Sequence, residues 1–118
     1  MKLVRDKIPD IIKEDGKECK YHVASYDEYK ARLYEKMREE LDEFINTPCY
    51  EEAADIYEVF SSICAIHDMN MVQVEVAAID KRSKRGGFQN RIVLEKVYET
   101  VESQSKDAVQ KAPIRRTR

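Results

Sequence analysis

Hydrophobic positions recur with a helical period through residues 27–45. Apolar side chains at spacings of three and four residues lie on one face of an α-helix, so this stretch predicts an amphipathic helix. Ser25 and Asp27 are both suitable N-caps for it. The residues that make the stripe are Leu33, Met37, Leu41, Phe44 and Ile45.

Two more helices are predicted downstream. A second is expected over residues 48–67, with Thr47 as its cap and Pro48 at its first position, where a proline loses no hydrogen bond. A third follows Asn70, because residues 72, 76 and 79 are apolar at i, i+4 and i+7. Gly86-Gly87 is expected to end it with a left-handed residue.

Two short segments have a different character. Lys20 to Ala24 and Arg91 to Val97 contain β-branched or aromatic residues, and each alone would be a marginal strand. We expect them to pair as a small β ribbon that ties the lead-in, residues 1–17, to the segment after the third helix. The lead-in itself is predicted to hold about one helical turn near Pro9.

The predicted fold is therefore all-α, with three main helices and this ribbon. A domain is expected over residues 1–102. The polar, basic tail over residues 103–118 has no helical or strand period and is expected to be disordered.

Composition is consistent with one soluble domain. The chain has 118 residues, of which 42% are hydrophobic and 37% charged, and a formal net charge of −2. This near balance favours neither nucleic-acid nor membrane-surface binding. Three cysteines without metal-site spacing, and no apolar N-terminal run, predict a cytoplasmic protein.

Several acids point toward the apolar stripes of the first two helices. With Asp55 at zero on a helical wheel, Val59 and Ile63 fall at about 40° and 80°, and Glu52 at about 60° between them. On the first helix Glu40 borders the stripe, and Glu43 lies about 60° to one side. An acid inside an apolar stripe needs a partner.

The register of a helical hairpin supplies a second constraint. If the first two helices turn back at Thr47-Pro48, Glu43 meets Glu52 and Glu40 meets Asp55. Four carboxylates at one level repel one another unless they are protonated or bind a cation. Since only oxygen ligands are offered, Mg²⁺ is favoured, with Mn²⁺ possible.

A structural interpretation competes with this one. In a chain so rich in charge, acids three residues apart usually lie on a wet helix face, paired with residues such as Lys36 or Arg38. That is the simpler explanation for either acidic pair alone. The inward orientation and the matched register together favour the metal site.

The acidic pattern resembles that of a known family. Glu39-Glu40-x-x-Glu43 followed by Glu52-x-x-Asp55 is similar to the signature of the all-α nucleoside triphosphate pyrophosphohydrolases, the MazG superfamily. KLVRDKIP at residues 2–9 and KRGGFQNRIVLEKV at residues 84–97 resemble a MazG-like branch of predicted house-cleaning pyrophosphatases. The resemblance covers about residues 1–98.

This resemblance implies a hydrolase that cuts a nucleoside triphosphate between the α and β phosphates in a Mg²⁺-dependent reaction. It implies that the metal ligands are Glu40, Glu43, Glu52 and Asp55. Glu39 or one of the ligand acids, Glu40 among them, would accept the proton of the attacking water. The eight residues from Phe44 to Glu51 require a tight hairpin.

Cations are needed to bind the triphosphate. The candidates are Arg5, Lys7, Lys36, Lys81, Lys84 and Arg85. Each also has a structural explanation: Lys36 as an ion-pair partner, the basic residues of the third helix as complements to its dipole, and the lead-in as a packed strap.

Both the apolar faces and the resemblance predict a homodimer or a higher homo-oligomer that completes the bundle. Two alternatives to the house-cleaning enzyme stay open. One is a phosphoribosyl-ATP pyrophosphohydrolase of histidine synthesis. The other is a helical nucleotide-binding or oligomerisation module without turnover.

Overall fold

The structure, a computed structural model, describes residues 1–100. The predicted disordered tail over residues 103–118 lies outside them. The chain divides into two units, Met1–Lys84 and Arg85–Arg118, and each is described by itself. The predicted extent of the domain, residues 1–102, stays a prediction.

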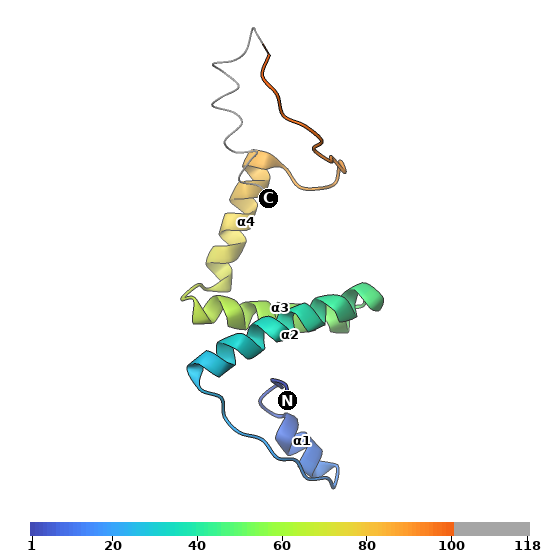
Figure 1. Cartoon of the computed structure of the whole chain (residues 1–118), viewed down its shortest axis with the longest axis vertical. Coiled ribbons are helices and arrows are strands. Elements are labelled where there is room, and N and C mark those ends of the chain that lie inside the picture. The colour runs from blue at the N-terminus through green and yellow to red at the C-terminus, as the bar shows by residue number, and fades with distance from the viewer. Residues whose placement is uncertain (101–118) are drawn as a thin grey trace. The chain divides into compact units, whose positions relative to one another are not determined.

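All regular secondary structure within residues 1–100 is helical. The elements are α1 (Ile8–Glu14), α2 (Tyr26–Asn46), α3 (Tyr50–Ile66) and α4 (Met71–Arg85) (Figure 1). The three main helices match the predicted segments, and the all-α class is confirmed. The lead-in forms two turns of helix rather than about one, because Pro9 in the first turn of α1 has the φ angle that a helix needs.

The predicted β ribbon is wrong for the described part of the chain. Residues 20–24 and 91–97 have no strand structure. Their apolar side chains are largely exposed, with Val23 at 89% and Ile92 at 84%. An isolated two-stranded ribbon without a buried face gains too little to form.

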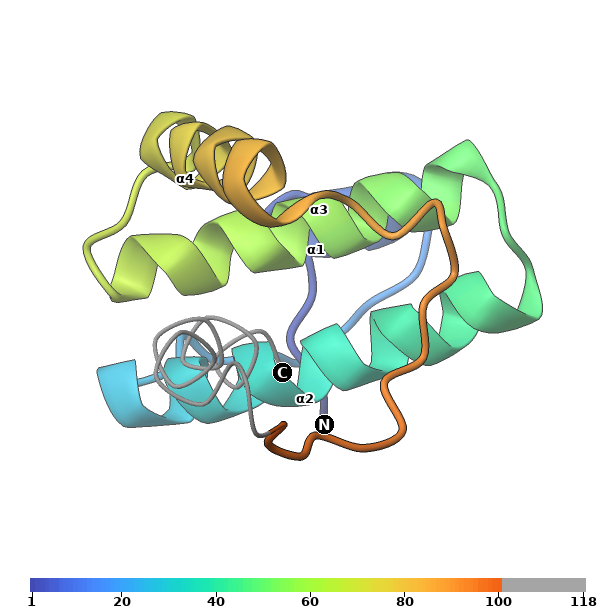
Figure 2. The same ribbon diagram turned by 90° about the horizontal axis from the view of Figure 1, so that it is seen from above.

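The hairpin of α2 and α3 carries the buried core of the first unit. The two helices contact each other and run antiparallel, with α2 in front of α3 in Figure 1 and the two side by side in Figure 2. Among the described residues, the buried apolar side chains are Leu33 from α2 and Val59 and Cys64 from α3. Glu40 of α2 is buried beside them, at 4% exposure.

The ends of α2 follow from local chemistry. Ser25 is its N-cap, because its hydroxyl accepts a hydrogen bond from the Glu28 amide at 3.2 Å. Thr47 closes the helix by donating its amide to the Glu43 carbonyl. Of the two predicted caps, Ser25 is the one used.

The predicted restart at Thr47-Pro48 is wrong. Thr47 is the C-cap of α2, and α3 begins at Tyr50 with Cys49 as an N-cap that makes no side-chain hydrogen bond. The proline disfavours helical geometry in Thr47, the residue before it, so α2 ends there. The connection is nevertheless short, as the acidic spacing required.

The end of α4 agrees with the prediction. Gly86 follows its last residue with φ +84°, the left-handed conformation that glycine adopts without a steric penalty. In the second unit, the Arg91 amide donates to the Phe88 carbonyl at 3.1 Å and closes a turn.

Candidate functional site

The predicted acids of α2 and α3 come together in two overlapping groups. Oxygens of Glu40, Glu52 and Asp55 all lie within 4.8 Å of one another, and so do oxygens of Glu39, Glu40 and Glu43. Glu40 belongs to both. We call these five residues the acidic cluster.

The antiparallel hairpin is what assembles the cluster. Glu40 and Asp55 meet across the helix pair, as the predicted register requires. The oxygens of Glu43 group with those of Glu39 and Glu40 on its own helix. Glu43 is also close enough to Glu52 to act on it electrostatically.

Two oxygens of the cluster have no partner. Glu40 Oε2 and Glu52 Oε2 are buried and accept no hydrogen bond from any described group. A buried carboxylate oxygen without a hydrogen bond is costly, because it has lost its water without gaining a substitute. Each of these two oxygens could accept a hydrogen bond or bind a cation.

The electrostatics agree with this geometry. Burial raises the pKa of the Glu40 carboxyl, and repulsion from Glu43 and Asp55 adds to the effect, while Lys36 opposes it. Burial likewise raises the pKa of Glu52, helped by Glu43 and Asp55. In both residues the charged form is disfavoured by lost solvent and by neighbouring negative charge.

Two cations pair with members of the cluster. Lys36 Nζ lies 3.3 Å from Glu39 Oε1 and 3.6 Å from Glu40 Oε1. Arg5 Nη2 lies 2.7 Å from Asp55 Oδ1. This bond, with the charges of nearby acids, raises the pKa of the guanidinium. The sequence predicted both residues as phosphate ligands, and the structure places both against carboxylates.

A groove of about 860 Å³ lies beside the cluster. It is lined by the N-terminal segment, by the start of α1 and by the facing sides of α2 and α3. Of the predicted site residues, those that line it are Arg5, Lys7, Lys36, Glu40 and Asp55. The groove therefore brings cations and acids to one surface.

Three predicted cations lie elsewhere on the chain. Lys81 is exposed on α4 and is not a lining residue of the groove. Lys84 pairs with Asp80 at 3.3 Å, one turn away on the same helix. Arg85 ends α4 and is the first residue of the second unit, so its role stays a prediction.

Sequence reasoning missed two features of the site. It did not foresee that Arg5 contacts Asp55, since 50 residues separate them and no helical period links them. It also gave no role to Glu58, which lines the groove and helps to raise the pKa of Arg5. The N-terminal segment lines the groove together with α2 and α3, and a helical wheel of one helix does not include it.

The donor set fits a hard divalent cation. It consists of carboxylate oxygens, two of them buried and unpartnered, without a sulfur or imidazole ligand in either group. Glu40 is shared by both groups. The same carboxylates can also hold or release a proton at the groove.

Comparisons with family models, with curated proteins and with solved structures find no significant match to this chain. None of the described helices is long and apolar enough to cross a membrane.

Proposed function

We propose that this protein is a nucleoside triphosphate pyrophosphohydrolase that requires Mg²⁺ and cleaves between the α and β phosphates. The observation that carries the proposal is Glu40, a buried carboxylate with an unpartnered oxygen, shared by two groups of acids on a helical hairpin. The resemblance of residues 1–98 to MazG-like enzymes supports the same activity.

The metal ligands in this proposal are Glu40, Glu43, Glu52 and Asp55. A Mg²⁺ ion bound there would neutralise charge on the triphosphate and lower the pKa of a coordinated water. Mn²⁺ offers similar coordination chemistry and is a suitable substitute in experiments.

The chain's own residues bind and orient the substrate. Arg5, Lys7 and Lys36 line the groove and offer positive charge to the phosphates. Lys81 and Arg85 stay candidates for the same role. Glu39 is partly exposed, at 42% of its side chain, next to Glu40. Either of these two acids can take the proton of the attacking water.

We further propose that the protein acts as a homodimer or a higher homo-oligomer. Apolar side chains on all three main helices are exposed in the described residues, among them Leu41 and Ile45 of α2 and Phe60 of α3. Burying such faces against a second copy is the usual way for a short helical hairpin to complete its core.

The first experiment is an assay of pyrophosphate release. The purified protein is incubated with Mg²⁺ and a panel of ordinary, oxidised and deaminated nucleoside triphosphates, with phosphoribosyl-ATP included. We expect release of pyrophosphate and a nucleoside monophosphate, and the preferred substrate distinguishes house-cleaning from a role in histidine synthesis.

The matched variants are Glu52→Gln and Asp42→Asn. Each removes one carboxylate charge from the hairpin, but Asp42 is exposed and lies outside the acidic cluster. We expect Glu52→Gln to lose more than about 100-fold in rate, since even residues that only orient metal ligands cost 10- to 100-fold when mutated. Asp42→Asn should keep its activity.

Two results would contradict the proposal. Turnover that survives in Glu52→Gln would place the chemistry outside the cluster. A protein that binds nucleotide but turns over no member of the panel would instead be a helical binding module.

A further inference from the structure

The ion pair between Arg5 and Asp55 joins two distant parts of the first unit. Arg5 precedes α1 and Asp55 lies in α3, and their side chains are 56% and 37% exposed. Asp55 is also one of the three acids that converge at the buried end of the cluster. The Arg5 guanidinium therefore already pairs with Asp55, a carboxylate that a metal ion at the cluster would also use.

A divalent ion and Arg5 would share the carboxylate of Asp55. An ion held by Glu40, Glu52 and Asp55 would bind oxygens that all lie within 4.8 Å of one another, and Arg5 Nη2 is 2.7 Å from one Asp55 oxygen. Two positive groups so close repel strongly in a site that is partly shielded from water. The ion and the guanidinium therefore compete for Asp55.

The strength with which each cation binds Asp55 decides whether the ion or the Arg5 guanidinium leaves. Half-exposed ion pairs such as Arg5–Asp55 are weak, because water and salt screen them. A divalent cation gains from three carboxylates at once, and two of these have an oxygen that nothing else satisfies. The ion is expected to displace the guanidinium.

We propose that Arg5 is a displaceable counterion of the acidic cluster, and that binding of a divalent cation transfers its guanidinium from Asp55 to the groove. This inference rests on the proposed function, since it needs a metal at the cluster. The freed side chain would face the groove that Lys7 and Lys36 also line. There its planar fork matches the oxygens of a phosphate. Metal binding thus prepares the site for the substrate.

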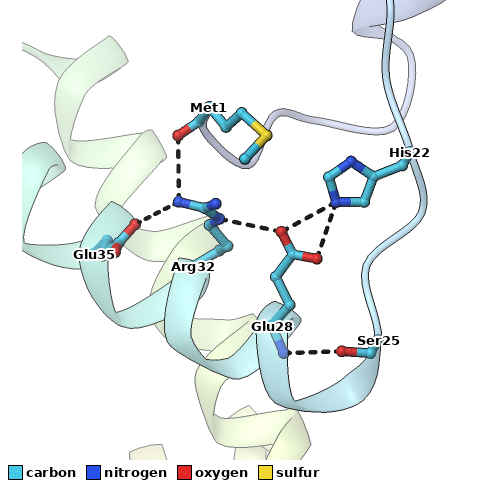
Figure 3. Close-up of polar contacts among 6 residues, drawn as sticks. All are labelled: Met1, His22, Ser25, Glu28, Arg32 and Glu35. Carbon is cyan, nitrogen blue, oxygen red and sulfur yellow. Dashed lines mark hydrogen bonds and ion pairs between the residues drawn. The ribbon is translucent and has the colours of Figure 1, made fainter.

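The N-terminal segment stays attached when Arg5 moves. The Met1 carbonyl accepts a hydrogen bond from Arg32 Nη1 at 3.4 Å, and Arg32 is itself held by Glu28 and Glu35 (Figure 3). The Ile8 amide also donates to the Arg5 carbonyl. The change is therefore confined to the Arg5 side chain and the backbone next to it.

The first test measures metal affinity by titration calorimetry with Mn²⁺ on the full chain. We compare the wild type with Arg5→Gln and Lys7→Gln, which remove the same charge from the same segment. Removing the competitor should tighten Mn²⁺ binding by about three- to fivefold in Arg5→Gln, as expected for loss of a weak ion pair. Lys7→Gln should stay within about twofold of the wild type.

The second test follows the Arg5 side chain directly. In a ¹⁵N-labelled protein, the Arg5 Nε–H signal is assigned by its loss in Arg5→Gln and followed during a Mg²⁺ titration. We expect it to move toward the position of an unpaired arginine, in proportion to the occupancy of the site.

The outcomes separate this inference from the proposed function. If Mn²⁺ binds but the Arg5 signal stays in place, or if Arg5→Gln binds Mn²⁺ no more tightly than Lys7→Gln, Arg5 is not displaced and the metal site stands alone. If the wild type binds no Mn²⁺, both proposals fail together.

Discussion

Glu40 is the residue at which stability and proposed function conflict. It is the buried charged residue of the hairpin, and only one of its oxygens has a cationic partner, Lys36. Burial and the nearby acids raise the pKa of Glu40 and of Glu52 above the ordinary value of 4.5. Both residues therefore bind protons more readily in the folded chain than in the unfolded chain.

These raised pKa values make the contribution of the two residues to stability fall as pH rises. A carboxyl with a raised pKa stabilises the fold fully below its unfolded pKa, and this contribution is lost as pH rises through the folded value. We expect the contribution of Glu40 and Glu52 to the stability of the fold to decline as pH rises from about 4.5. Glu28 acts in the opposite direction, because its hydrogen bond to His22 lowers its pKa.

Glu40→Gln is therefore predicted to stabilise the protein at pH 7 without added metal. The unfolding free energy should rise by about 1 kcal/mol, in the range for removing an unsatisfied buried polar charge. Urea unfolding at several pH values measures this, and the gain should shrink toward pH 4.5. Glu39→Gln is the control, since Glu39 is partly exposed and paired with Lys36. A loss of stability in Glu40→Gln would show that Lys36 already compensates the buried charge.

At the scale of elements, the hairpin depends on where each helix stops. The α2 helix has a side-chain cap at Ser25, whereas α3 begins at Cys49 without one. Next to Ser25, His22 Nε2 lies 2.9 Å from Glu28 Oε1, so the segment before α2 is bound to its first turn by side chains (Figure 3). Side-chain contacts replace the strand pairing that the sequence predicted there.

Ser25→Ala should weaken α2 from its first turn. Loss of the hydroxyl leaves the Glu28 amide without its partner, and substitutions of this kind cost about 0.5 to 2 kcal/mol. Chemical denaturation followed by circular dichroism measures the loss. Ser25→Asp keeps an acceptor at the same position and should retain most of the stability. Equal stability in Ser25→Ala and the wild type would mean that packing against α3 alone sets the start of the helix.

At the scale of the whole molecule, the described residues bury few apolar side chains. In α4, Val72, Val76 and Ile79 fall on one helical face, and they are 68%, 55% and 63% exposed. A continuous apolar face in water favours association with another surface. This supports the proposed homo-oligomer.

Val76→Lys should lower the association state. A charge in the middle of this face opposes its burial, while lysine itself is a good helix former. Light scattering coupled to gel filtration, over a range of protein concentrations, measures the mass. Ala78→Lys is the control, because Ala78 is exposed about 160° away on the same helix. If the wild type is a monomer at every concentration, the proposal of a homo-oligomer is wrong. If both lysine variants behave like the wild type, α4 is not the contact.

The sequence by itself determined the three main helices, their order and the inward orientation of Glu40, Glu52 and Asp55, because helical periodicity is a local property of the chain. It also determined that the hairpin places Glu40 opposite Asp55, because a short turn leaves little freedom in how the two helices align. The predicted ribbon failed because strands need a partner, and pairing is not a local property. Only the tertiary structure decided that Arg5 contacts Asp55, because that contact joins side chains 50 residues apart in the sequence.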